Sequence, residues 1–165
     1  MDDLKTRFKN TLFLQLYAFF KIPLLAWVRP QVLENSTEKT VLKLPLSRRT
    51  KNHLNVMYFG ALGMGAEACI ALKAVQAIEK SGQRIDFIFK DFQAQFLKRA
   101  ESDVHFTCDQ GREVEALLQK AIASKERETQ TFRSYATTPD KTGNEVVAEF
   151  KVTLSIKLRQ KKTVP

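Results

Sequence analysis

Apolar and polar side chains alternate along the last third of the chain, where apolar residues occupy every even position from Val146 to Leu158. This alternation predicts one long strand with a single buried face. At about 3.4 Å per residue the strand would be roughly 44 Å long, so its sheet must twist and curl. The same period predicts strands elsewhere, with a bulge near Lys90 and Asp91 where the parity of the apolar positions changes. These strands lie within residues 31–47 (two short segments), 85–96, 104–108 and 128–138.

Residues 57–80 are apolar on nearly every side, and Gly82 follows them in the position typical of a helix end. A helix without a polar face must be enclosed, so we expect an α+β architecture in which a curved antiparallel sheet wraps around a central helix. Gly60, Gly63 and Gly65 weaken this helix and indicate close approach by a strand, by the same helix of a second copy, or by a ligand. A shorter amphipathic helix is predicted over residues 111–124.

The N-terminal region has apolar residues at every fourth position from Leu4 through Phe8, Leu12 and Leu16 to Phe20. This row predicts a helix, and Lys21 and Pro23 interrupt the apolar run that a membrane span would need. We interpret it as a helix that covers the fold, with a helix at a membrane surface as the alternative. The chain is then a single domain (1–165), with a covering helix in residues 1–29, a core in 30–159 and a basic tail in 160–165.

The net charge of +9 over 165 residues favours an anionic partner such as nucleic acid, a membrane surface or a phosphorylated ligand. No nucleic-acid-binding motif accompanies the charge, so we expect no nucleic-acid partner. Cys69 and Cys108 lack metal-ligand spacing, which indicates reduced core cysteines in a cytoplasmic protein without a metal or cofactor.

A single carboxylate, Glu67, interrupts the otherwise uncharged stretch from Val56 to Leu72. An ionised carboxylate in an apolar interior is costly unless it is paired, partly hydrated or used in chemistry. Two interpretations follow. Glu67 forms an ion pair with Arg or Lys on a neighbouring strand, or it is a catalytic group whose pKa is raised by burial.

The order of these elements resembles the hotdog fold, and three residues resemble acyl-CoA thioesterases of the phenylacetate-pathway type. Asn52 lies fifteen positions before Glu67 and Gly60 lies seven before it, and both spacings match the family pattern. Tyr58 stands where the family has histidine, and Phe59 where it has the first of two glycines. The extra helices are similar to those of an uncharacterised thioesterase branch of this fold.

The resemblance implies a thioester hydrolase that acts on acyl-CoA or a related thioester, and that works as a homodimer or a dimer of dimers. Glu67 would be the general base or nucleophile, and backbone N–H groups near Phe59 and Gly60 would hold the thioester oxygen at the helix N-terminus. Asn52 would position water or the carbonyl, or would only hold its loop. The remaining substrate-binding candidates are Tyr58, Phe59, Arg48, Arg49 and Lys51.

Arg48, Arg49 and Lys51 lie in a polar loop before the central helix. Their side chains would suit the phosphates of coenzyme A, or they only form a solvated loop. A non-catalytic protein of the same fold that binds acyl-CoA or an acyl chain is the alternative function. An integral membrane span is not expected.

Overall fold

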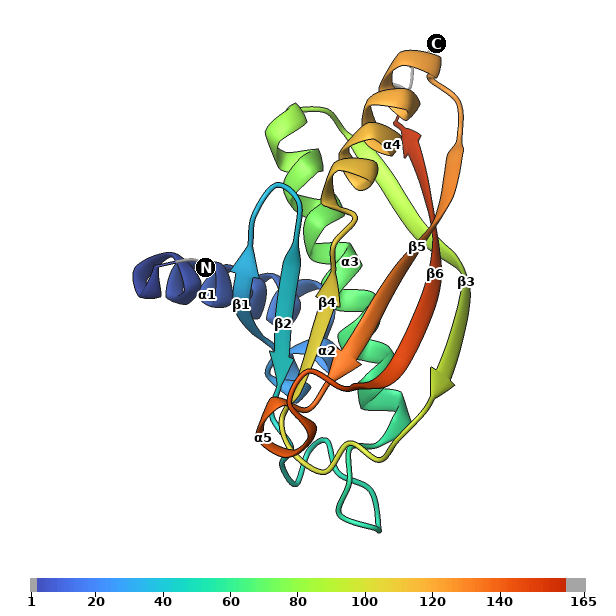
Figure 1. Ribbon diagram of the computed structural model, residues 1–165. Helices are drawn as coiled ribbons and strands as arrows, with labels where there is room; N and C mark the ends of the chain where they lie inside the picture. Colours follow the sequence, from blue (N-terminus) through green and yellow to red (C-terminus); the bar gives the residue numbers. More distant parts are fainter. Residues whose placement is uncertain (1–2, 160–165) are drawn as a thin grey trace.

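A computed structural model describes residues 3–159 as an α+β fold with one six-stranded antiparallel sheet (Figure 1). The order across the sheet is β1-β2-β4-β5-β6-β3. The strands are β1 (Gln31–Asn35), β2 (Thr40–Leu44), β3 (Ile85–Phe96), β4 (Val104–Cys108), β5 (Glu128–Thr137) and β6 (Val146–Leu158). The helices are α1 (Leu4–Lys21), α2 (Pro23–Val28), α3 (Phe59–Ser81), α4 (Gly111–Ser124) and α5 (Pro139–Thr142). The predicted basic tail, 160–165, lies outside the described residues.

The sheet curls around α3, which lies in its concave side as a central helix (Figure 1). This arrangement confirms the predicted hotdog architecture. The long alternating segment forms β6, which pairs with β5 and with β3 on its two sides. The register between β3 and β6 shifts between Phe89 and Asp91, so the predicted bulge is also confirmed. The segment Pro139–Thr142, between β5 and β6, is the short helix α5.

Helix α3 lies at the centre of the hydrophobic core. Its small residues allow the sheet to approach its backbone closely. A Cβ atom at Gly65 would lie only 2.3 Å from the ring of Phe106 on β4. A strand of the same chain is therefore the close neighbour at this glycine. Although α3 is long and apolar enough to cross a membrane, most of it is buried inside the fold, as in the core helix of a soluble protein.

Two glycines of α3 provide a matched pair for measuring this close approach. We expect Gly65→Ala to lower the free energy of unfolding by about 1–2 kcal/mol, because the fully buried ring of Phe106 has no room to move. Gly63→Ala should instead raise it by about 0.5–1 kcal/mol, because alanine favours the helix. A Cβ atom at Gly63 would lie 3.5 Å from the ring of Phe92, which is an ordinary van der Waals distance. Urea denaturation of the two variants measures both effects, and equal stabilisation by both would contradict this account.

Helix α1 packs against β1 through a different side from the one that its sequence suggested. Its buried residues are Leu14 and Ala18, and the Thr11 hydroxyl accepts a hydrogen bond from the Val32 N–H at 2.9 Å. The amide of Gln15 donates to the Pro30 carbonyl at 2.7 Å. The predicted apolar row is exposed on the opposite side, at Leu4, Phe8, Leu12, Leu16 and Phe20. The expectation that this row covers the fold is therefore wrong.

Candidate functional site

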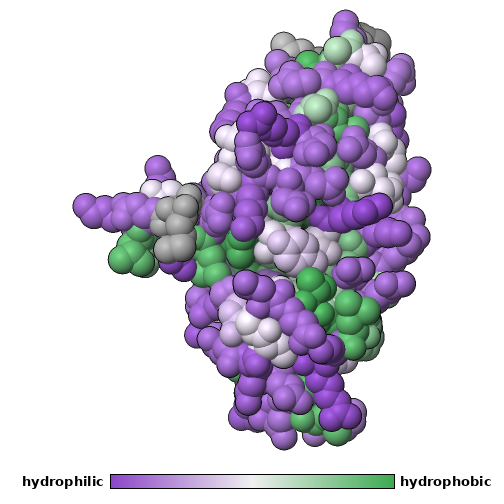
Figure 2. Space-filling view, viewed as in Figure 1, coloured by the Kyte–Doolittle hydropathy of each residue, from purple (hydrophilic) through white to green (hydrophobic). Residues whose placement is uncertain are grey.

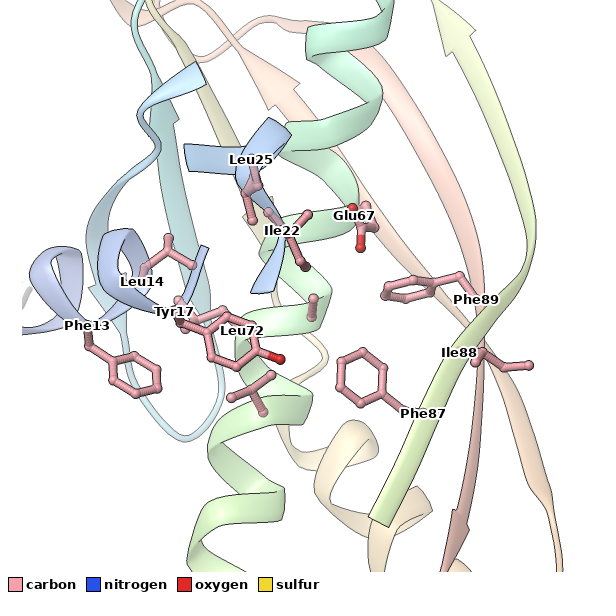
Figure 3. Close-up of a pocket in the computed structure, with 13 residues that line it drawn as sticks. Phe13, Leu14, Tyr17, Ile22, Leu25, Glu67, Leu72, Phe87, Ile88 and Phe89 are labelled. Atoms are coloured by element: carbon pink, nitrogen blue, oxygen red, sulfur yellow. The ribbon is translucent and has the colours of Figure 1, made fainter. Parts of the chain in front are cut away.

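A pocket of about 320 Å³ opens beside Glu67, between α3, the N-terminal helices and β3. Figure 3 shows Glu67 on α3, with Phe13 and Tyr17 of α1 on one side and Phe87 and Phe89 of β3 on the other. The remaining lining residues are apolar: Leu14, Ile22, Leu25, Ala68, Ala71, Leu72, Val75 and Ile88. Glu67 is thus the one carboxylate among the described residues that line this apolar pocket.

The carboxylate of Glu67 forms no ion pair with any Lys, Arg or His among residues 3–159. Burial alone raises the pKa of the Glu67 carboxyl, without a nearby charge to lower it. The proposed ion pair with a neighbouring strand is therefore not present among residues 3–159. A half-buried carboxylate with a raised pKa that faces a pocket is typical of a general base.

The raised pKa has a consequence for stability. A carboxyl whose pKa is higher in the folded than in the unfolded state destabilises the fold once it is ionised. This cost is absent below the ordinary pKa of glutamate, and grows as the pH rises toward the folded-state value. We therefore expect Glu67→Gln to raise the melting temperature at pH 8 and to leave it nearly unchanged at pH 4. Thermal melts of the parent and of Glu67→Gln between pH 4 and pH 8 test this expectation. A stabilisation by Glu67→Gln that is largest at acid pH would contradict it.

The pocket contains residues that sequence reasoning did not assign to a site. Tyr17 supplies its second polar group, and its hydroxyl points into the pocket (Figure 3). The rings of Phe13 and Tyr17 stack with centroids 6.2 Å apart. Phe13 and Tyr17 lie four residues apart, so they share one side of α1. This second apolar row is the feature of the sequence that could have indicated the pocket. Phe87 and Phe89 belong to the strand predicted within residues 85–96, but periodicity alone does not place their rings in the same pocket as Glu67.

A second hollow, of about 590 Å³, brings together three of the predicted site residues, Asn52, Tyr58 and Phe59. We call it the Asn52 groove. It lies between the start of α3 and the end of β3, where the Phe59 and Phe96 rings meet edge to face with centroids 6.4 Å apart. Tyr58 and Phe59 are both largely exposed. The groove therefore combines an aromatic surface with the N-terminus of the central helix.

The N-terminus of α3 presents backbone N–H groups to this groove. The side chain of Tyr58, the N-cap residue of α3, forms no capping hydrogen bond within the described part of the chain. The N–H groups of the first turn have no acceptors within the helix, so they are open to a ligand. The Asn52 Oδ1 atom accepts hydrogen bonds from the N–H groups of Leu54 at 2.9 Å and Val56 at 3.3 Å. Asn52 thus holds its loop, and its amide nitrogen has no hydrogen-bond partner among residues 3–159. A Cβ at Gly60 would lie 2.4 Å from the Tyr58 ring, so this glycine accommodates a ring of its own chain.

The three basic loop residues lie outside both hollows. The guanidinium of Arg49 sits over the ring of Trp27 on α2, 4.8 Å from its centroid. Lys51 donates a hydrogen bond to the Asn55 side chain at 2.9 Å, and Arg48 is exposed. No group of three or more His, Cys, Asp or Glu side chains within residues 3–159 is arranged to hold a metal ion.

Within one chain, Glu67 and the start of α3 belong to separate hollows. Seven residues separate Gly60 from Glu67, which corresponds to about 10.5 Å along a helix axis. One thioester carbonyl cannot contact both at hydrogen-bond distance. In one chain the Glu67 carboxylate and the N-terminus of α3 therefore open into two different hollows.

Residues 10–156 match the family described as Domain of unknown function (DUF4442). The chain belongs to this DUF4442 family. The match covers α1 from Asn10 onward, the whole core and nearly all of β6, so it includes both hollows. Among curated proteins, none matches this chain.

Solved structures with the same fold include proteins described as thioesterases. A protein of unknown function from Chlorobaculum tepidum is similar with a TM-score of 0.79 at 9% identity, over 93% of this chain and 97% of that one. A probable thioesterase from Pseudomonas aeruginosa has a TM-score of 0.70 at 19% identity, over 90% and 96%. A thioesterase from Haemophilus influenzae has a TM-score of 0.64 at 13% identity, over 90% and 92%. These likenesses establish the hotdog fold of this DUF4442 member.

Proposed function

We propose that this DUF4442 protein hydrolyses an acyl thioester, with acyl-CoA as the substrate class and Glu67 as the catalytic carboxylate. The observation that carries the proposal is Glu67 in an apolar pocket, without an ion pair among residues 3–159 and with its pKa raised by burial. The pocket suits an acyl chain because its walls are almost entirely aliphatic and aromatic. The thioesterases among the structures of the same fold support the reaction class.

The chemistry requires a base, an electrophile and donors for the developing charge. Glu67 takes a proton from water as the water oxygen bonds to the thioester carbon, or its own oxygen attacks that carbon. Backbone N–H groups near Phe59 and Gly60 hold the oxyanion, assisted by the helix dipole. On the first route the carbon–sulfur bond then breaks, the thiolate takes the proton from Glu67, and the carboxylic acid leaves. On the second route, breaking of this bond leaves a mixed anhydride on Glu67; water hydrolyses the anhydride to release the carboxylic acid, and the proton left on Glu67 passes to the thiolate. Asn52, through its amide, orients the carbonyl or the water.

A complete site needs two copies of the chain, and β3 is the element that would join them. This strand pairs with β6 on one side, and no described strand covers its other edge. Its first half lines the Glu67 pocket through Phe87 and Phe89, and its end lines the Asn52 groove through Phe96. Antiparallel pairing of β3 with a second β3 sets the first half of one strand beside the last half of the other. Such a dimer would bring one copy's Glu67 toward its partner's α3 N-terminus.

A panel of acyl-CoAs of different chain lengths, with free thiol as the readout, tests the proposal. We expect thiol release that saturates with substrate and favours acyl chains long enough to fill the apolar pocket. Saturable binding without thiol release would instead support the non-catalytic acyl-CoA or acyl-chain binding protein. Neither binding nor release with any member of the panel would overturn both functions.

A further inference from the structure

Helix α1 projects from the body of the molecule with an apolar surface that nothing in the described structure covers (Figure 1). We call this surface the α1 outer row: Leu4, Phe8, Leu12, Leu16, Phe19 and Phe20. Phe8 is 71% exposed and Phe20 is 74% exposed, although phenylalanine is strongly driven out of water. Figure 2 shows hydrophobic side chains along this protruding helix beside hydrophilic ones. A patch of this kind on a soluble domain marks a docking surface.

The charged residues around the α1 outer row indicate which kind of partner binds it. Residues 4–33 contain no Asp or Glu, while they include Lys5, Arg7, Lys9, Lys21 and Arg29. Helical spacing places Lys5 and Lys9 on the same half of α1 as the apolar row. A helix that exposes Leu and Phe side chains, carries several basic residues and has no carboxylate suits the plane of an anionic membrane interface. The lysines then reach anionic headgroups while the apolar side chains enter the acyl boundary.

A second copy of the chain fits this surface less well. Across a two-fold axis the row would meet itself, so Lys5 and Lys9 would face an equally basic surface that has no carboxylate to pair with. The row also stands on a projecting convex helix about 27 Å long, which suits a planar surface. We propose that the α1 outer row docks this protein onto an anionic lipid surface, as a peripheral interfacial helix.

Docking would place the Glu67 pocket next to the lipid. The opposite side of α1 contributes Phe13, Leu14 and Tyr17 to that pocket, so only the width of one helix, about 10 Å, separates the two. A thioester with a lipid-partitioned acyl chain would then be the preferred substrate. This last point rests on the proposed hydrolysis, whereas docking itself does not.

Co-sedimentation with lipid vesicles tests the docking without any assay of activity. We expect binding to vesicles of phosphatidylcholine with roughly one third phosphatidylglycerol, and at least about tenfold weaker binding to phosphatidylcholine alone. Binding should fall as salt shortens the Debye length from about 10 Å at 0.1 M to about 3 Å at 1 M. Equal binding to both vesicles, or binding to neither, would overturn the proposal.

Variants at exposed positions locate the surface with little risk to folding. The pair Phe8→Ser with Phe20→Ser, and separately Lys5→Glu with Lys9→Glu, should each weaken binding at least about tenfold. Matched controls away from α1 are Leu54→Ser with Leu97→Ser, and Lys141→Glu with Lys151→Glu, which should bind like the parent protein; all four control positions are exposed. Parent-like binding by the Phe8 and Phe20 variant would overturn the assignment. So would dissociation of a dimer by that variant, measured by light scattering, when the parent does not bind vesicles.

Discussion

Replacing Glu67 with glutamine should lower kcat/KM for acyl-CoA hydrolysis by about 10²–10⁴-fold, the usual contribution of a positioned general base. Glutamine keeps the shape of the side chain but cannot accept the proton of water. Because Glu67 has no cationic partner among the described residues, the substitution leaves no buried charge unpaired, and the fold should be kept. Loss of turnover with an intact melting transition is therefore the expected result.

The pH dependence of the parent enzyme provides the second half of this test. Only the ionised carboxylate acts as a base, so kcat/KM should fall as the pH drops through the pKa of Glu67. Burial raises that pKa, which places the acid limb above the pH at which an ordinary glutamate titrates. The glutamine side chain of the Glu67→Gln variant does not titrate, so the residual rate of this variant should lack the acid limb. A variant that retains both full activity and the acid limb would rule out Glu67 as the base.

Removing one backbone donor at the start of α3 should lower kcat by about 10²–10³-fold, as expected for the loss of an oxyanion-hole N–H. Phe59→Pro achieves this with little disturbance of the helix. Phe59 is the first helical residue, where proline is tolerated, and the preceding Tyr58 already has the extended backbone (ψ 137°) that proline requires. Phe59→Ala is the matched control, because it removes the same ring and keeps the N–H. Equal activity of these two variants would exclude the Phe59 amide from the oxyanion site.

Mixing these two inactive proteins tests whether each site uses two copies of the chain. If Glu67 acts with the amide of the partner's Phe59, a mixed dimer of Glu67→Gln and Phe59→Pro contains one intact site. Refolding equal amounts together should then restore about a quarter of the parent activity, since half of the dimers are mixed and half of their sites are intact. No recovery, in a sample where mixed dimers are demonstrated, would show that the two groups do not act across an interface.

Much of the fold was predictable because burial in a sheet or a central helix leaves a periodic record in the chain. The single buried face of β6 appears directly as alternating apolar positions, and the parity change in β3 marked its bulge. Enclosure of α3 followed from its lack of a polar face. Glu67 stood out for the same reason, since one carboxylate in an apolar helix is conspicuous without any structure.

The sequence by itself therefore determined the sheet, the central helix and the isolated carboxylate. Only the tertiary structure decided which side of α1 is buried, because two rows of that helix are apolar and periodicity cannot choose between them. The hydrogen bonds of Thr11 and Gln15 hold one side of α1 to the backbone at Val32 and Pro30, Leu14 and Ala18 are buried, and the larger Leu and Phe row is left in solvent. The structure also decided that Glu67 and Phe59 open into separate hollows, because the walls of each hollow come from distant parts of the chain that only the fold brings together.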